Sequence, residues 1–144
     1  MFKKIVVGAD DSPTAASAVE TAMSLARLCG AELHIVTAYK PERARPPREG
    51  GLPEELRYSL STHPADSLLE RLAGRARALS LDPIVHAAAG QPADTLTSVA
   101  EREDADLIVV GNKGMKGARR VLGSVPNDVA HHASCSVMIV DTTG

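Results

Sequence analysis

Two short segments of the sequence carry residue types that can hold a phosphorylated ligand. Residues 8–12 read Gly-Ala-Asp-Asp-Ser, and residues 111–124 contain glycines at positions 111, 114 and 123 followed by Ser124. The carboxylate of Asp10 can accept hydrogen bonds from ribose hydroxyls or from an adenine amino group. Glycines let backbone N–H groups approach a ligand closely, and the first turn of a helix after Ser124 would attract an anion. Together the two segments predict a site for a phosphorylated compound.

Each segment also has a plainer interpretation, and the residues alone leave both open. Asp10 or Asp11 could cap the helix that follows and interact with its positive end. Residues 111–124 could form a flexible turn whose lysines and arginines are only solvated. The stretch is neither a G-x-x-x-x-G-K-[ST] phosphate loop nor a G-x-G-x-x-G fingerprint. His131 and His132 are potential bases, but on a short helix that turns away from the glycines we expect them at the surface.

Both segments follow predicted strands, in a chain where strands and helices alternate. Runs of β-branched and other apolar residues predict five strands, at residues 4–8, 33–38, 83–88, 107–110 and 137–140. Apolar spacing and capping signals predict helices after Ser12, over 64–80, after Pro92 and over 126–132. This alternation is typical of an α/β domain with a mostly parallel sheet and helices on both faces. Such sheets bind ligands beyond the carboxyl ends of their strands, where the strand order reverses.

Composition indicates a single domain over residues 1–144 with one unusual connection. The chain is 44% hydrophobic and 24% charged with a formal net charge of -2, which argues against intrinsic disorder, nucleic-acid binding and a polybasic membrane contact. No apolar run approaches a membrane span or a signal-peptide core, so we expect a soluble cytoplasmic protein. Residues 40–61 are rich in proline, glycine and charge, which predicts either a flexible segment or a lid over a ligand. Cys29 and Cys135 belong to no CxxC pair and are expected as reduced thiols.

Three segments of the chain resemble the universal stress protein family: residues 3–10, 111–124 and 136–140. The family's nucleotide motif, G-x2-G-x9-G-[ST], is matched by Gly111, Gly114, Gly123 and Ser124, although the longer spacer has only eight residues, 115–122. These matches resemble the nucleotide-binding branch of the family. The resemblance extends over the whole chain and implies an open, five-stranded, Rossmann-like sheet with strand order 3-2-1-4-5. In that order the ends of the first and fourth strands lie side by side.

The resemblance also implies which residues bind the nucleotide. They are Ala9, Asp10, Val36, Val110, Gly111, Gly114, Gly123, Ser124 and Val125. The resemblance implies that Asp10 contacts the adenine or the ribose. It also implies that Ala9 and Val36 line the adenine slot, with Val110 below it. The first two glycines are implied to hold the ribose and phosphates. Gly123, Ser124 and Val125 are implied to donate hydrogen bonds to the phosphates.

The function implied by the resemblance is that of an ATP-binding stress-response protein, acting as a sensor or regulator through ligand-dependent changes in a loop or a dimer. AMP and cyclic AMP are alternative ligands, and Mg²⁺ could accompany ATP at Asp10 and Asp11. Family members pair the last strand across a two-fold axis, which implies a homodimer through the segment from Val137 to Val140. No positioned nucleophile and base can be read from the sequence, so we expect at most slow ATP hydrolysis. A true ATPase or phosphotransferase and a nucleotide-free interaction module are the alternative hypotheses.

Overall fold

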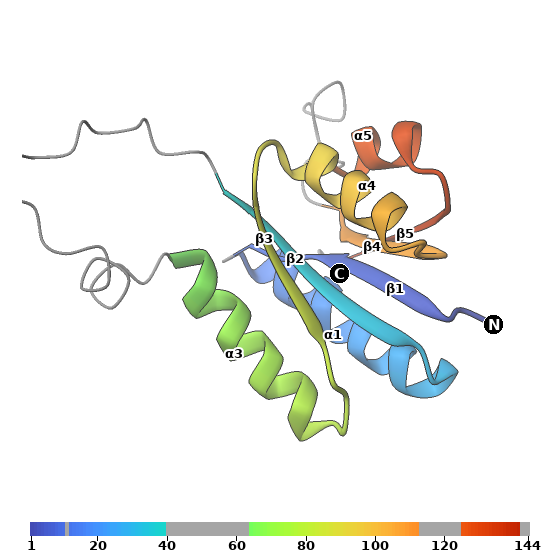
Figure 1. Cartoon of the computed structure of the whole chain (residues 1–144). Helices are drawn as coiled ribbons and strands as arrows, with labels where there is room; N and C mark the ends of the chain where they lie inside the picture. Colours follow the sequence, from blue (N-terminus) through green and yellow to red (C-terminus); the bar gives the residue numbers. More distant parts are fainter. Residues whose placement is uncertain (11, 40–63, 113–124, 142–144) are drawn as a thin grey trace, which may run out of the picture.

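The computed structural model describes residues 1–10, 12–39, 64–112 and 125–141. Within them, five strands form one parallel sheet in the order β3-β2-β1-β4-β5 (Figure 1). The strands are β1 (Lys4–Gly8), β2 (Glu32–Tyr39), β3 (Ile84–Ala89), β4 (Leu107–Gly111) and β5 (Ser136–Val140). The helices are α1 (Pro13–Cys29), α3 (Pro64–Ala78), α4 (Pro92–Arg102) and α5 (Val125–His132). The predicted α/β class and strand order are therefore confirmed.

The two central strands are the most deeply buried part of the sheet. The fully buried residues of β1 and β4 are Ile5, Val6, Val7, Ile108 and Val109. Their β-branched side chains fit a pleated strand, and burial on both faces explains the unbroken apolar runs in the sequence. Val7 lies opposite Val109 in the parallel register, so β1 and β4 end side by side at one edge of the sheet.

Helices cover both faces of the sheet and give the molecule three layers (Figure 1). On one face, α1 and α3 enclose a core that includes Leu72 and Ile35 of β2. On the other, α4 and α5 enclose a second core that includes Leu96, Val129 and Val36 of β2. Ile35 and Val36 belong to different cores because successive strand residues point to opposite faces. The chain leaves β1 for one helical layer and β4 for the other.

Local sequence signals set both ends of α1. Ser12 has an extended backbone, and its hydroxyl accepts a hydrogen bond from the Ala15 N–H at 3.2 Å, while Pro13 begins the helix. Gly30 ends the helix in the left-handed conformation, with φ at 65° and its N–H bonded to the Ala26 carbonyl. A serine cap followed by proline and a left-handed glycine are common signals for the start and the end of a helix. They place the amino end of α1 directly beyond the carboxyl end of β1.

The edge strands are less buried than the centre of the sheet. Ile84 and Val85 of β3 are 41% and 44% exposed, and Ile139 of β5 is 37% exposed. This exposure explains why the third strand carries a weaker apolar signal than the central ones. The last strand lies at the edge of the sheet, as the resemblance implied.

Three further expectations concern the long connection, membrane-spanning helices and the two cysteines. Residues 40–61, predicted to be flexible or a lid, lie outside the described residues. Among the helices that are described, none has the length and apolar character needed to span a membrane. Cys29 and Cys135 are free thiols, and burial, with a smaller effect of the Asp106 charge, raises the pKa of Cys135.

Candidate functional site

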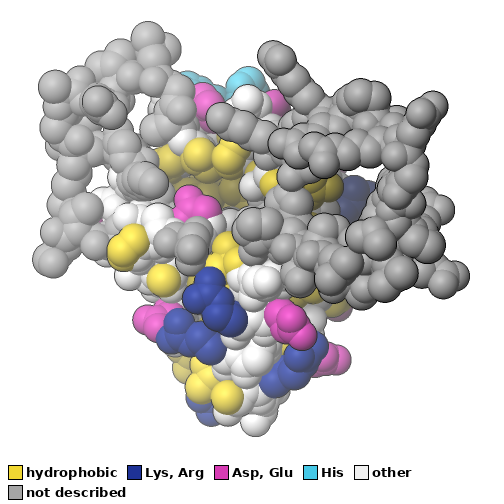
Figure 2. Space-filling model, turned by 90° about the vertical axis from the view of Figure 1, so that its left-hand side faces the viewer, with side chains coloured by type: hydrophobic (Ala, Val, Ile, Leu, Met, Phe, Trp, Pro, Cys, Tyr) yellow, Lys and Arg dark blue, Asp and Glu magenta, His cyan; other side chains and the backbone are white. Residues whose placement is uncertain are grey.

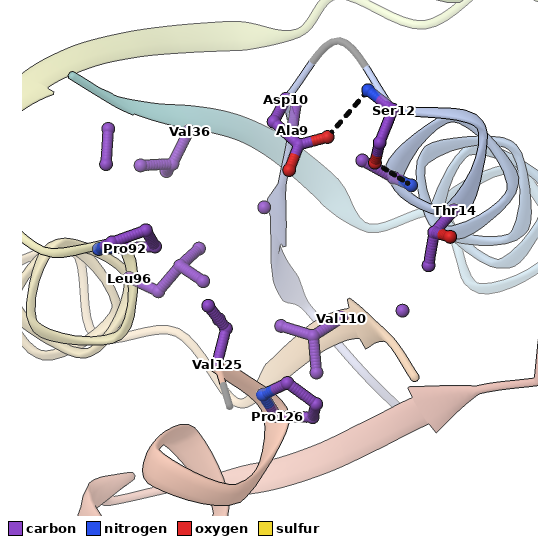
Figure 3. A pocket seen from close by; sticks show the side chains of 14 residues that line it. Ala9, Asp10, Ser12, Thr14, Val36, Pro92, Leu96, Val110, Val125 and Pro126 are labelled. Carbon is purple, nitrogen blue, oxygen red and sulfur yellow. Dashed lines mark hydrogen bonds between the residues drawn. The ribbon is translucent and has the colours of Figure 1, made fainter. Parts of the chain in front are cut away.

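The carboxyl ends of β1, β2 and β4 and the amino ends of α1, α4 and α5 surround one pocket (Figure 3). Seen from this end of the sheet, hydrophobic side chains lie in a hollow of the surface with acidic side chains nearby (Figure 2). The lining residues are Gly8, Ala9, Asp10, Ser12, Thr14, Ala15, Val36, Ala38, Pro92, Leu96, Val110, Gly111, Val125 and Pro126. The pocket lies where the strand order reverses between β1 and β4, the usual place for a ligand in an α/β sheet.

Six of the nine residues predicted to bind a nucleotide line this pocket. They are Ala9, Asp10, Val36, Val110, Gly111 and Val125. The other three, Gly114, Gly123 and Ser124, lie outside the described residues. The fold therefore brings together the described members of the predicted set from three strands and a helix, while their roles toward a ligand stay predictions.

Eight further residues line the pocket: Gly8, Ser12, Thr14, Ala15, Ala38, Pro92, Leu96 and Pro126. Gly8 and Ser12 lie in the segment 8–12 that the sequence marked as a candidate site, whereas the other six were not predicted. Pro92 begins the helix that follows the third strand, so its place at the carboxyl edge could have been inferred from the alternation of strands and helices. Thr14 gave no such signal, because its contact with the end of β4 depends on how α1 packs.

Asp10 is the charged residue among the described residues that line the pocket. Its Oδ1 accepts a hydrogen bond from the backbone N–H of Ser12 at 2.7 Å, and Ser12 in turn caps α1 (Figure 3). The helix-capping role considered for Asp10 thus belongs to Ser12. Asp10 instead orders the turn between β1 and α1, which holds its carboxylate in one orientation at the exposed rim of the pocket.

The opposite wall of the pocket is apolar, and most of its described side chains are buried. Val36, Leu96 and Val110 expose 1%, 3% and 3% of their surface, and Val125 joins them from α5 (Figure 3). The Ala9 N–H donates to the Val36 carbonyl at 2.8 Å and extends the pairing of β1 with β2 to the pocket. An apolar wall facing a carboxylate suits a flat ligand with one hydrophobic body and hydroxyl or amino groups at its edge.

Gly111 forms the point at which β4 meets α1. A Cβ atom at this position would lie 2.6 Å from Thr14 Cγ2 and 3.0 Å from the Thr14 carbonyl oxygen. Side chains do not pack at such distances, so a residue without a Cβ is needed for β4 to approach the first turn of α1. Gly111 therefore has a packing role that the motif alone did not indicate, in addition to its predicted contact with a ligand.

Asn112 fixes the end of β4 relative to β5. Its side chain is only 8% exposed, and its Nδ2 donates to Asp141 Oδ1 at 3.0 Å. Asn112 is also the last described residue before position 125. The hydrogen bond therefore anchors the described end of β4.

The described residues provide no assembled acid–base or metal-binding group at the pocket. Among them, no three His, Cys, Asp or Glu side chains are grouped so that they could hold a metal ion. His131 and His132 lie at the carboxyl end of α5, are exposed, and do not line the pocket. Their surface position agrees with the prediction. What this part of the chain offers a ligand is one oriented carboxylate, backbone groups and an apolar wall.

A sequence model of the Universal stress protein family matches residues 1–141. The chain belongs to this family. Universal stress protein Rv1636 of Mycobacterium tuberculosis is 36% identical over 148 residues, which cover 99% of this chain and 98% of the relative. Universal stress protein YxiE of Bacillus subtilis is 30% identical over 148 residues, with 97% and 99% coverage. The resemblance inferred from the motifs is thereby confirmed.

Solved structures of the family share the fold of this universal stress protein. One, a universal stress protein in complex with cAMP, is 33% identical, covers 99% of this chain and 98% of its own, and superimposes with a TM-score of 0.78. The universal stress protein UspA from Lactobacillus plantarum is 25% identical with a TM-score of 0.71, over 96% of this chain and 97% of its own.

Proposed function

We propose that this universal stress protein binds an adenine nucleotide in the pocket between β1 and β4. The observation that carries the proposal is the convergence of six predicted nucleotide-binding residues on one pocket at the reversal of strand order. A structure that is 33% identical over nearly its whole length was solved in complex with cAMP, which supports the same ligand class here.

The chemistry of the walls indicates how such a nucleotide would lie. The adenine packs against the apolar wall that contains Val36 and Val110, and the ribose hydroxyls or the adenine amino group donate to the carboxylate of Asp10. The phosphates lie away from that negative charge, toward the end of β4 at Gly111. Lys113 and Lys116 follow Gly111 in the sequence, and their positive charges favour an anion near Gly111.

Cyclic AMP and ATP are both candidates within this class. The related complex favours cyclic AMP, and the sequence motif favours ATP. Where ATP binds with Mg²⁺, the described residues supply the single carboxylate of Asp10, so phosphate oxygens and water would provide most of the remaining ligands. We infer a sensor or regulator, as the resemblance implies, because the described lining residues offer one oriented carboxylate and an apolar wall, which suit ligand binding. A cytoplasmic location, predicted from the sequence, fits the sensing of a cellular nucleotide.

Isothermal titration calorimetry with cyclic AMP, AMP, ATP and ATP–Mg²⁺ tests the proposal, with GTP as the competitor of another base. The key variant is Asp10→Asn, because its side-chain oxygen can still accept the Ser12 N–H while the charge is lost. Asp82→Asn is the matched control, since Asp82 is exposed beyond the carboxyl end of α3, away from the pocket. We expect Asp10→Asn to weaken adenine-nucleotide binding by about tenfold, the value of one charged hydrogen bond of about 1.5 kcal/mol, and Asp82→Asn to leave it unchanged.

Three outcomes would change the proposal. If no adenine nucleotide binds, the protein is an interaction module without a nucleotide. If ATP turns over orders of magnitude faster than in a Gly114→Ala/Ser124→Ala variant, the protein is an ATPase or phosphotransferase. Equal effects of Asp10→Asn and Asp82→Asn would show that the ligand lies elsewhere on the protein.

We also propose a homodimer formed by β5. This strand lies at the edge of the sheet and presents Ile139, which is 37% exposed, beside backbone groups that can pair with another strand. Ile139→Lys should shift the protein to monomers in sedimentation equilibrium. Leu28→Lys, at an 84% exposed leucine of α1, introduces the same charge away from β5 and should not. A wild-type monomer at high concentration would refute the dimer and leave the nucleotide site untouched.

A further inference from the structure

A chain of three side chains joins β2 to β3 on the α4 face of the sheet. Glu32 Oε1 lies 2.6 Å from His34 Nε2, and His34 Nδ1 lies 2.9 Å from His86 Nε2. His34 is completely buried, His86 is partly buried, and their rings stack with centroids 5.2 Å apart. The two histidines are 52 residues apart in sequence and meet because β2 and β3 run parallel in this register.

The hydrogen bonds determine where the protons of this chain lie. The carboxylate of Glu32 can only accept, so His34 carries a hydrogen on Nε2. A neutral His34 then accepts at Nδ1, and the hydrogen between the rings must come from Nε2 of His86. One further proton can enter at Nδ1 of His86 without disturbing either bond. A second added proton would bind His34 Nδ1, so that this atom and His86 Nε2 would both carry a hydrogen and the hydrogen bond between the rings would break.

The charged groups around the pair favour this limit of one added proton. On the same face, Lys4 of β1 lies in the next strand and its Nζ donates to the Glu103 carbonyl at 3.1 Å, while Arg102 and Glu103 end α4. α3 packs on the opposite face of the sheet. Burial is the main cause that lowers the pKa of His86 below 6.5, and the charge of His34 lowers it further. Arg102 acts in the same direction and Glu103 against it, and the net effect disfavours a positive charge on His86.

The pair is directly connected to the wall of the nucleotide pocket. Val36 follows His34 by two residues and therefore lies on the same face of β2, roughly 7 Å along the strand. It is also the residue opposite His86 in the register of β2 and β3. Val36 and Ala38 both line the pocket. A change in the spacing of β2 and β3 at the histidines therefore reaches the apolar wall.

We propose that the His34–His86 hydrogen bond is a pH-dependent clamp between β2 and β3 that holds the apolar wall in place and lowers the affinity for an adenine nucleotide when both rings are protonated. The effect on affinity rests on the proposed function, whereas the clamp itself does not.

The clamp can be measured without a ligand by NMR. In ¹⁵N-labelled full-length protein at pH 7.5, we expect a hydrogen on Nε2 of both rings and an unprotonated His34 Nδ1. On titration to pH 5.0, the backbone amide shifts of Val36 and Ala38 should follow the second protonation step of the histidine pair, in which the hydrogen bond between the rings is lost. Cyclic AMP is the probe for affinity, because its phosphodiester keeps one charge over this range, whereas a terminal phosphate titrates near pH ~6. We expect its affinity to fall by about fivefold or more between pH 7.5 and 5.0.

Three variants isolate the pair. His86→Gln places a non-titrating amide N–H near the position of Nε2, so it should keep the link to His34 and make affinity nearly independent of pH. His132→Gln makes the same change at an exposed histidine of α5 and should keep the wild-type profile. Glu32→Gln still accepts from His34 but no longer stabilises a positive charge, so the loss of affinity should move to lower pH.

The results separate the clamp from the proposed function. If cyclic AMP binds at no pH while Val36 still follows the histidine titration, the clamp stands and the proposed function fails. If cyclic AMP binds and His86→Gln retains the wild-type pH profile, the clamp is wrong and the proposed function stands. Should His86→Gln fail to fold, the direction of the shift in Glu32→Gln decides, and an unchanged profile in that variant overturns the clamp.

Discussion

Replacement of Gly111 by alanine tests how closely β4 and α1 pack at the pocket. The added Cβ would lie 2.6 Å from Thr14 Cγ2 and 3.0 Å from the Thr14 carbonyl oxygen. The first atom belongs to a β-branched side chain with few alternative rotamers in a helix, and the second belongs to the backbone of α1. Neither can yield without a shift of the first turn of α1 or of the end of β4.

The expected cost is that of overpacking, about 1–3 kcal/mol of unfolding free energy. For a chain of this size each kcal/mol corresponds to roughly 2–4 °C in melting temperature. Because one of the two close contacts is the Thr14 methyl group, Thr14→Ala should relieve part of the cost, with a coupling energy of about 0.5–3 kcal/mol. Gly74→Ala is the matched control: a Cβ at Gly74 would meet no atom within 4 Å, so this change in α3 should stabilise by about 0.5–1 kcal/mol.

Urea unfolding of wild type, the three single variants and the Gly111/Thr14 double variant, followed by circular dichroism, provides these energies. The packing argument fails if Gly111→Ala is as stable as Gly74→Ala, or if Thr14→Ala brings no relief. Calorimetry with cyclic AMP on the same proteins separates the two roles of Gly111. Because Thr14 also lines the pocket, the comparison uses the Thr14→Ala variant as its reference. A double variant that regains stability but binds cyclic AMP more weakly than Thr14→Ala alone would show that Gly111 also contacts the ligand directly.

Two further predictions concern the stability of the protein without a ligand. Ser12→Ala should lower the unfolding free energy by about 0.5–2 kcal/mol in urea titrations, because the N–H of Ala15 loses its cap; no loss would mean that Pro13 alone defines the helix start. Partial burial would raise the pKa of Asp106, but hydrogen bonds from the N–H groups of Lys3 and Lys4, its own N–H and the N-terminal charge together lower it below 3.8. The ionised Asp106 therefore stabilises the folded protein above pH 3.8, and this stabilisation is lost as the pH falls through the lowered pKa. Asp106→Asn should have a lower unfolding free energy at neutral pH, and its stability should depend less on pH below pH 4. An acid-unfolding transition unchanged from that of the wild type would refute this.

The buried parts of the fold could be predicted from the sequence because their composition is dictated by burial itself. β1 and β4 stand out as apolar runs since both of their faces are covered. The end of α3 was less accurate: the predicted helix reaches residue 80, whereas the observed one ends at Ala78 and Ser80 takes a left-handed backbone with φ at 63°. No glycine marks this turn, so the sequence contains no strong stop signal there.

The same distinction applies to the candidate site: residues placed by a buried strand could be predicted, and contacts set by tertiary packing could not. Asp10 and Val110 could be placed because they follow buried strands, and the carboxyl ends of parallel strands share an edge. The Thr14–Gly111 contact and the His34–His86 hydrogen bond could not, because both depend on distances set by tertiary packing and strand register.

The strand order explains why folding and ligand contacts coincide at this edge. From β1 the chain passes into α1 on one face of the sheet, and the helix that follows β4, α5, lies on the other face (Figure 1). The connections therefore diverge between β1 and β4, and a crevice opens that no other pair of strands provides in this order. At its bottom the strands must still approach the helices, which is why Gly111 touches α1 and why Gly8 leaves only 2.9 Å between a Cβ and Leu96 Cδ1. Small residues at this edge thus serve the packing first, and the same lack of side chains leaves the backbone accessible to a ligand.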